Sequence, residues 1–330
     1  MYEKIIVVTR PTRMQELIAR FHTKANARFY LEHSGANYEE YEAEHYAYQD
    51  ALEQAAKQMD IGLKIQYVER KYISNFVFAD NELLVAIGQD GLVANVAKYA
   101  HDLPIIGVNP DPARIDGVLV PVSVGNLRAS INEAISNRRS LVHVTLAEAK
   151  LNDGQRLLAF NDFFIGAQSH ISARYHVQYG NQAEDQSSSG IIVSTGAGST
   201  GWLSSLFNMA SGLNRMMGRE ALRPMRLSWS SQELVFVVRE PFISKHSQAN
   251  VSGGILKAGQ SLTLESRMPS GGTIFSDGIE SDFLLFNSGS IASIQKAKEK
   301  ALIYIPERSE KIKSSATTHN RIAAISSQKR

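Results

Sequence analysis

Cysteine is absent from the 330 residues of this chain, which excludes disulfides, thiolate zinc sites and thiol nucleophiles together. Long apolar runs are also missing: no stretch approaches the roughly 20 apolar residues that a helix needs to cross a bilayer. Neither sign of charge is in clear excess, since the chain has 35 Lys and Arg and 33 Asp and Glu. It also lacks a block of basic residues of the kind that binds nucleic acid. We therefore expect neither nucleic acid nor a membrane among the partners.

The length of the chain and its apolar content of 43% are typical of a globular protein with about two domains. The N-terminal residues Met1–Val8 have the pattern of a strand rather than the layout of a signal peptide. Together with the lack of cysteine, this pattern predicts a cytoplasmic protein.

Apolar runs alternate with helical patterns over residues 1–137. Strands are predicted at Ile5–Val8, Lys64–Val68, Leu83–Ile87, Leu103–Val108 and Val118–Val122, and helices over residues 14–31, 38–59, 92–99 and 127–136. Strands that alternate with helices predict an α/β domain with a parallel sheet.

The pattern changes from about Ser140 onward to short strands separated by turn residues. Residues 138–294 are therefore predicted to form a β-rich, mostly antiparallel domain, with Gln155–Ile165 as one strand and Trp202–Leu213 as a helix. Residues 307–330 are polar and lack periodicity, which predicts a flexible tail.

The strand at Leu83–Ile87 runs directly into Gly88-Gln89-Asp90-Gly91. In open α/β sheets, ligands bind at this carboxyl end of the strands. The glycines permit positive φ and a close approach of a ligand to the backbone, and the Asp90 carboxylate can take a proton from a substrate hydroxyl. An ordinary turn is the alternative interpretation of the same four residues.

Two further polar segments follow in the second domain. Thr195–Trp202 comes after an apolar strand and opens a helix, which favours an anion site, with a capped Gly-rich turn as the alternative. Asn161-Asp162 interrupts apolar neighbours, so one of these side chains faces a pocket or a buried partner unless the pair is a bulge or turn. Asp277-Gly278 predicts a hairpin turn without further function.

In this order, Gly88–Leu92, Asn161-Asp162 and Thr195–Trp202 resemble the Gly-Gly-Asp-Gly-Thr, Asn-Glu and Thr-x-x-Gly-Ser-Thr-Ala-Tyr motifs of the NAD kinase family. The resemblance covers roughly residues 80–300, and Ile105–Arg114 is similar to the matching segment of the mitochondrial-type members. It implies the NAD kinase-like two-domain fold, in which residues of about 295–306 return to the first domain, and a homodimer or homotetramer.

The resemblance also implies an activity: a phosphotransferase that uses ATP or polyphosphate to phosphorylate the adenosine-ribose 2′-hydroxyl of NAD(H), giving NADP(H). Asp90 matches the catalytic aspartate that takes the hydroxyl proton. Mg²⁺ is expected to arrive with ATP rather than in a metal site of the protein. The phosphate loop would consist of Gly88, Gln89 and Gly91, and the NAD contacts of Asn161, Asp162, Thr200, Gly201, Trp202 and Ser205.

Several positions depart from the family pattern. Gln89 stands in place of a glycine, Leu92 in place of a threonine and Trp202 in place of a tyrosine. These departures leave two alternatives to an NAD kinase: a kinase of the same fold that acts on a lipid or sugar hydroxyl, and a non-catalytic nucleotide-binding or regulatory protein.

Overall fold

A computed structural model describes residues 2–100, 102–136 and 140–306 of the chain. The described chain divides into two compact units, one of residues up to Val142 together with the segment from Leu302, and one of His143–Ala301. The predicted boundary at residues 137–139 and the predicted tail at residues 307–330 lie outside the described residues. No helix in the described part of the chain is long and apolar enough to span a bilayer.

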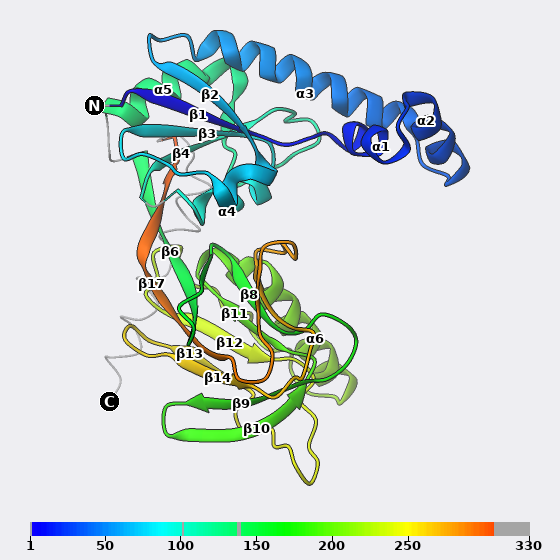
Figure 1. The fold of residues 1–330 in the computed structure, drawn as a ribbon, viewed down its shortest axis with the longest axis vertical. Helices are drawn as coiled ribbons and strands as arrows, with labels where there is room; N and C mark the ends of the chain where they lie inside the picture. Colours follow the sequence, from blue (N-terminus) through cyan, green and yellow to red (C-terminus); the bar gives the residue numbers. More distant parts are fainter. Residues whose placement is uncertain (1, 101, 137–139, 307–330) are drawn as a thin grey trace. The chain divides into compact units, whose positions relative to one another are not determined.

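The first unit is built on a parallel sheet, whose strands lie in the order β4-β3-β1-β2 (Figure 1), and β5 pairs with β4. The end of β17 adds to it, because Leu302 pairs in parallel with Pro104. Every residue of β3 is buried, as expected of a strand covered on both faces. The strands are β1 (Lys4–Thr9), β2 (Lys64–Glu69), β3 (Glu82–Ile87), β4 (Pro104–Asn109) and β5 (Val122–Ser123).

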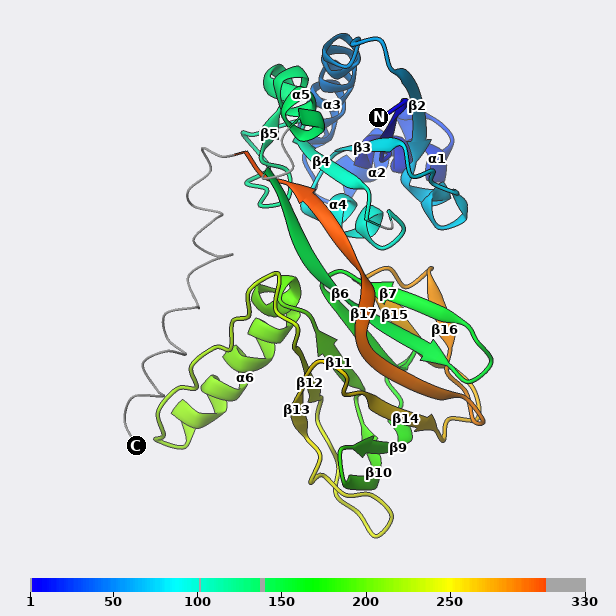
Figure 2. The same cartoon turned by 90° about the vertical axis from the view of Figure 1, so that its left-hand side faces the viewer.

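Helices cover both faces of this sheet. Helices α3 and α5 pack on one face, where Tyr48 and Ile131 join the apolar residues of β1, β3 and β4, and α4 contacts β3 and β4 from the other (Figure 2). The single helix predicted over residues 14–31 is wrong, because His22 adopts a left-handed φ of 66° and Thr23 caps a new helix. The helices are α1 (Arg13–Phe21), α2 (Lys24–His33), α3 (Tyr38–Gln58), α4 (Asp90–Ala97) and α5 (Leu127–Ser136), with short 3₁₀ turns at Arg70–Asn75 and Val124–Asn126.

The strand predicted at Val118–Val122 is also wrong over most of its length. Only Val122 and Ser123 pair with a neighbouring strand. The backbone N–H groups of Val118 and Leu119 donate instead to the carboxylate of Asp90, at 2.9 Å and 2.8 Å. The Asp90 side chain thus binds the N–H groups that a neighbouring strand would bind in the predicted strand.

The second unit is β-rich and largely antiparallel, so the predicted fold class is confirmed. One sheet has the order β13-β12-β11-β8-β15-β16, and the strands β10-β9-β14-β17 with β6 and β7 lie in another. The first set is β8 (Asp162–Ala167), β11 (Ile191–Ser194), β12 (Leu234–Val238), β13 (Gly253–Leu256), β15 (Gly272–Ser276) and β16 (Phe283–Leu285). The second set is β6 (Leu141–Leu151), β7 (Arg156–Ala159), β9 (Ala173–Tyr179), β10 (Gln182–Ser188), β14 (Leu262–Ser266) and β17 (Ile291–Tyr304).

The single strand predicted at Gln155–Ile165 is instead two strands in different sheets. β7 pairs with β6, whereas β8 pairs with β11 and β15. The chain changes sheets at Phe160-Asn161, whose N–H groups are bound by the Asp277 carboxylate rather than by a strand.

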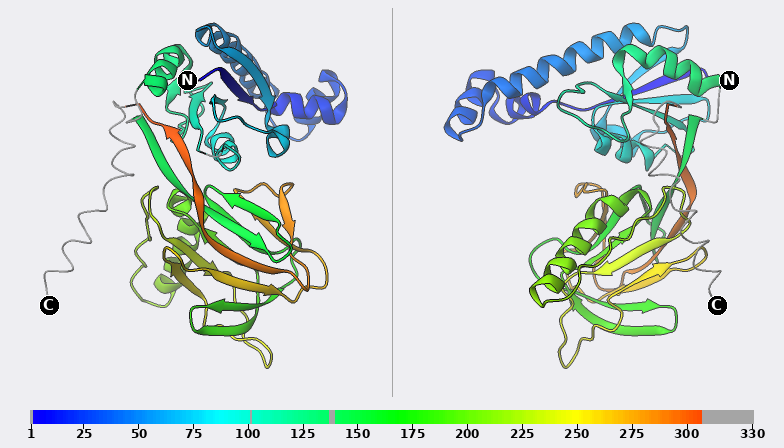
Figure 3. Two further views of the ribbon diagram at one scale, coloured as in Figure 1. Left: turned by 60° about the vertical axis from the view of Figure 1, so that its left-hand side comes forward. Right: turned by 180° about the vertical axis from the view of Figure 1, so that it is seen from behind.

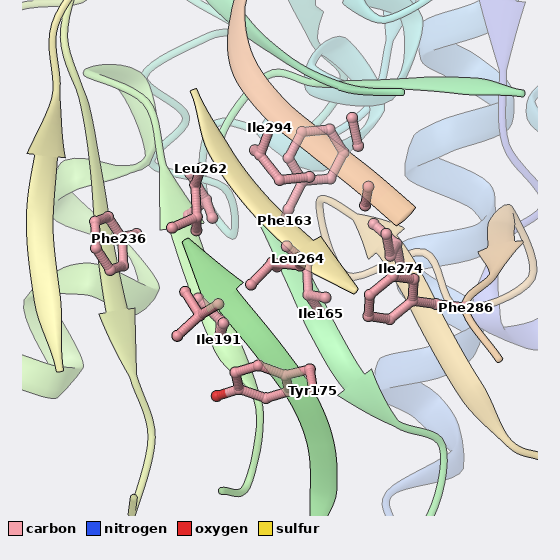
Figure 4. Packing of buried hydrophobic residues seen from close by; sticks show 14 of the residues in the cluster. Phe163, Ile165, Tyr175, Ile191, Phe236, Leu262, Leu264, Ile274, Phe286 and Ile294 are labelled. Atoms are coloured by element: carbon pink, nitrogen blue, oxygen red, sulfur yellow. The ribbon is translucent and has the colours of Figure 1, made fainter. Parts of the chain in front are cut away.

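The core of this unit lies between the two sheets (Figure 4). Phe163, Ile191 and Phe236 project from one sheet toward Tyr175 and Leu262 of the other, and all five side chains are fully buried. Burial of each such side chain contributes about 1.5–3 kcal/mol. Helix α6 (Trp202–Met216) contacts β11 and lies along this sheet (Figure 3). Trp202, its first residue, stacks on Phe164, which alternates along β8 with the core residue Phe163 and therefore faces away from the core.

Gly107 in β4 provides a test of the packing in the first unit. A Cβ atom at this position would lie 1.9 Å from the Leu119 carbonyl oxygen. Gly107→Ala should therefore lower the free energy of unfolding by about 1–3 kcal/mol, measured by urea denaturation. The control is Gly125→Ala, where a Cβ would have open space. Equal stability of the two variants would contradict this close packing.

Candidate functional site

The Asp90 loop lies at the carboxyl end of β3, as the sequence predicts. Gly88 follows the strand and donates its N–H to the Val108 carbonyl oxygen at 3.1 Å, which holds the loop against the end of β4. Asp90 is the first residue of α4 and is half-buried. Its two carboxylate oxygens accept the N–H groups of Val118 and Leu119, so the side chain has a defined orientation.

The glycines of this loop do not adopt the positive φ that glycine permits. Neither Gly88 nor Gly91 has a positive φ, and Gln89 is extended, with φ −107° and ψ 168°. Gln89 therefore introduces no backbone strain, and its exposed side chain leaves the packing undisturbed. Gly88 packs closely against Leu92: a Cβ at position 88 would lie 2.9 Å from Leu92 Cδ2, so that side chain would have to shift.

Two residues beside the loop were missed from the sequence. Gly117 has a φ of 47°, and a Cβ there would lie 2.2 Å from Val120 Cγ2 and 3.5 Å from Asp90 Oδ1. Arg10 follows β1 at the same edge of the sheet, and its buried Nε has no hydrogen-bond partner. The signal for Arg10 was its place directly after a buried strand, whereas Gly117 is recognisable only once the chain is folded.

The Asn161-Asp162 pair and the Thr195 loop are joined in the second unit. Thr195 Oγ1 donates to the Phe160 carbonyl oxygen at 2.6 Å, and Thr195 N donates to the Asn161 carbonyl oxygen at 2.9 Å. Gly198 lies so close that a Cβ there would be 2.1 Å from the Asn161 oxygen. Two segments separated by over thirty residues thus form one local structure.

Asp277 binds the backbone N–H groups of the same two residues, Phe160 and Asn161. Its Oδ2 accepts Phe160 N–H at 3.1 Å and its Oδ1 accepts Asn161 N–H at 2.6 Å. Thr195 donates to the two carbonyl oxygens, and the Asp277 carboxylate accepts from the two N–H groups. The backbone polar groups of Phe160 and Asn161 are therefore all paired. Buried peptide groups need such partners, and here they come from two distant segments.

Asp162 is the more deeply buried member of the pair. Burial, with a smaller contribution from the negative charge of Asp277, raises the pKa of Asp162 to about 7. Both causes disfavour the ionised form, so near neutral pH this carboxyl is divided between its protonated and ionised forms. Such a group can donate or accept a hydrogen bond to a ligand hydroxyl.

The remaining predicted contacts surround the start of α6. Residues Ala197–Thr200 form a 3₁₀ turn, and Gly201 precedes the helix. Thr200, Gly201 and Ser205 are exposed, and Trp202 is half-buried. The predicted helix opening after this loop is therefore confirmed, with free space beside the predicted contacts.

An aromatic pocket of about 810 Å³ begins at Trp202. The Trp202 ring stacks on Phe164 with the planes 7° apart, and the Arg239 guanidinium carbon lies 5.7 Å from the Trp202 ring centre. Phe275 and Ser189 also line the pocket, whereas Asn161 and Asp162 do not. Phe164, Phe275 and Arg239 were missed from the sequence, because strand aromatics are indistinguishable from core residues before folding.

The comparisons with known proteins agree with this architecture. No protein-family model matches the chain. The chain is 29% identical over 123 residues to an NAD kinase of Picrophilus torridus, covering 37% of the chain and 44% of that relative. It is 25% identical over 217 residues to a probable NADH kinase of Oryza sativa subsp. japonica, covering 58% of the chain and 62% of that relative. The chain thus spans less than two thirds of the length of these curated relatives.

Solved structures extend the comparison to nearly the whole fold. An NAD kinase from Archaeoglobus fulgidus in complex with ATP superimposes with a TM-score of 0.55 at 14% identity, covering 92% of this chain and 94% of that one. Yeast NADH kinase complexed with NADH gives a TM-score of 0.54 at 14% identity, covering 100% and 90%. The protein therefore has the two-domain fold of the NAD kinases. Sequence and fold together confirm its resemblance to the NAD kinase family.

The Thr195 hydroxyl can be tested separately from the rest of its loop. Thr195→Val should lower the free energy of unfolding by about 1–3 kcal/mol, because the buried Phe160 carbonyl and Gly198 N–H lose their partner. Urea denaturation measures the change. Thr195→Ser keeps the hydroxyl and should lose clearly less; a valine variant as stable as wild type would contradict the role of the hydroxyl.

The raised pKa of Asp162 predicts a pH dependence of stability. Because the folded value of about 7 exceeds the ordinary 3.8, the folded protein keeps a proton that the unfolded chain releases between these values. Stability should therefore decrease as the pH rises through this window. In Asp162→Asn this decrease is absent, so its free energy of unfolding relative to wild type should rise by about 2–4 kcal/mol between pH 4 and pH 7.

Chemical denaturation across this pH range checks the prediction. Asp153→Asn is the control, because hydrogen bonds from Gln155 lower the pKa of Asp153 and place its titration below the window. A constant difference between Asp162→Asn and wild type across the range would show that Asp162 ionises normally.

Proposed function

We propose that this protein is an NAD(H) kinase that transfers the terminal phosphate of ATP or polyphosphate to the adenosine-ribose 2′-hydroxyl of NAD(H). The observation that carries the proposal is the position of Asp90, half-buried and oriented at the carboxyl end of a parallel strand where α4 begins. The names of the relatives support the class of reaction, and the ATP and NADH complexes of the structural neighbours support the donor and the acceptor.

Asp90 is the general base of the proposed reaction. A carboxylate that takes the proton of the 2′-hydroxyl as the new O–P bond forms typically contributes a factor of about 10²–10⁴ to the rate. The hydrogen bonds from Val118 and Leu119 use one lone-pair direction on each oxygen and restrict rotation of the side chain. Both oxygens retain accepting capacity for the hydroxyl.

The phosphate donor is assigned to the loop of Gly88, Gln89 and Gly91 at the N-terminus of α4. Free N–H groups and the helix dipole favour anions there, and Arg10 brings a guanidinium close to Gly88. No group of three His, Asp or Glu side chains within the described residues is arranged to bind a metal ion. Mg²⁺ is accordingly proposed as the companion of the triphosphate, where it neutralises charge on the β and γ oxygens.

The acceptor nucleotide is assigned to the second unit. Asn161 and Asp162 would bind its ribose or adenine, and Thr200, Gly201 and Ser205 would contact it at the start of α6. Trp202 and Phe164 offer a flat apolar surface for one ring, and Arg239 offers a positive charge for the diphosphate. The proposal also includes the assembly of this chain into a homodimer or homotetramer.

Asp90→Asn tests the base. NADP(H) formation from NAD(H) with MgATP or polyphosphate should decrease at least about 100-fold in kcat, because an amide cannot accept the proton. Calorimetric affinity for NAD(H) should stay near that of wild type. The control is Asp116→Asn, which removes an exposed charge from the neighbouring loop and should keep full activity.

Two results would contradict the proposal at different points. Undiminished turnover by Asp90→Asn would remove this residue from the mechanism. A wild-type protein that binds NAD(H) but forms no NADP(H) with either donor would leave a nucleotide-binding protein without this activity.

A further inference from the structure

Asp277 belongs to none of the three motifs, and its sequence predicts only a hairpin turn. The hairpin is present, since β15 and β16 pair in an antiparallel register through Phe275 and Phe283. A turn, however, does not require the contacts that this residue makes. Its carboxylate accepts two successive N–H groups more than a hundred positions earlier in the chain, those of Phe160 and Asn161.

The backbone of Asp277 joins the same segment. Its N–H donates to the Asp162 carbonyl oxygen at 3.0 Å, which continues the pairing of β15 with β8 by one residue. Three hydrogen bonds therefore connect Asp277 to three consecutive residues, 160–162. A left-handed φ of 56° turns the chain so that side chain and backbone reach this segment together.

We propose that Asp277 is a positioning residue for nucleotide binding: it holds Phe160-Asn161-Asp162 in the conformation from which Asn161 and Asp162 reach the nucleotide. The inference rests on the proposed function for the identity of the ligand. Asp277 acts through the peptide groups and through Asp162, and it needs no contact with the substrate.

Thr195 alone cannot hold the segment in this way. It binds the carbonyl oxygens of Phe160 and Asn161, which leaves both N–H groups to Asp277. Without the carboxylate these N–H groups lose their partner at the point where the chain passes between sheets. Reorientation of the two peptides would then move the side chains of Asn161 and Asp162 together.

The charge of Asp277 has a second effect on the same site. Across its ladders Asp162 faces the uncharged Ser194 of β11 on one side and Asp277 on the other. After burial, the negative charge of Asp277 is the other cause that raises the pKa of Asp162. Removal of that charge should therefore lower the pH at which Asp162 ionises.

Asp277→Asn is the decisive variant, because asparagine has nearly the same shape and tolerates a left-handed φ. It can accept only one of the two N–H groups and carries no charge. We expect NAD(H) affinity in the full-length protein, measured by calorimetry between about pH 5.5 and pH 8.5, to weaken roughly tenfold to a hundredfold. The pH midpoint of binding should also move below that of wild type, because the negative charge of Asp277 helps to raise the pKa of Asp162.

Asp277→Glu separates position from charge. It keeps the negative charge and displaces the carboxylate by one methylene, so affinity should decrease while the pH midpoint stays closer to that of wild type. Asp153→Asn is the matched control, because Asp153 also accepts a backbone N–H in a hairpin of this unit, but its partner is Gln155 rather than the 160–162 segment. It should change neither affinity nor midpoint.

The outcomes separate this inference from the proposed function. A wild-type protein without NAD(H) binding would overturn the proposed function, and the nucleotide role of Asp277 with it. Binding by wild type that is unaltered in affinity and pH midpoint in Asp277→Asn would overturn the inference alone. Thermal unfolding of each ligand-free variant checks its fold; if Asp277→Asn does not fold, unaltered affinity in Asp277→Glu overturns the inference.

Discussion

In each unit, an aspartate carboxylate that accepts two consecutive backbone N–H groups holds candidate site residues in place. In the first unit Asp90 binds Val118 and Leu119, and in the second Asp277 binds Phe160 and Asn161. In each case the chain leaves regular pairing beside a sheet, and peptide groups there need other partners. A charged acceptor supplies hydrogen bonds stronger than neutral ones, so irregular backbone is held in one conformation.

This constraint connects stability with the proposed chemistry. The change of sheets at Phe160-Asn161 is tolerated because Thr195 and Asp277 satisfy its polar groups from two sides. The same arrangement brings Asp162 into a buried place, where its pKa rises to about 7. A carboxyl buried in this way lowers the stability of the ionised protein, which is consistent with the proposed role of Asp162 in binding rather than in packing.

The departures from the family pattern are accommodated differently. Gln89 adopts an extended conformation with its side chain outward, so the lost glycine leaves no strain in the loop. Leu92 is buried and packs against Gly88, where its apolar side chain fills space. Trp202 keeps an aromatic face and stacks on Phe164. The loop and the stacked Trp202–Phe164 pair thus accommodate the three substituted residues.

The sequence by itself determined the alternation of buried strands and helices, the change to a β-rich second half, and the order of the three motifs, because these depend on local periodicity and composition. Only the tertiary structure decided where strands end and which residues support the motifs. Val118 and Phe160 lie in apolar runs that predict strands, yet a distant carboxylate takes their N–H groups. Asp277 has a local sequence that indicates only a turn, and its partners become neighbours only when β15 pairs with β8. Such contacts depend on strand pairing between distant segments, which local patterns do not encode.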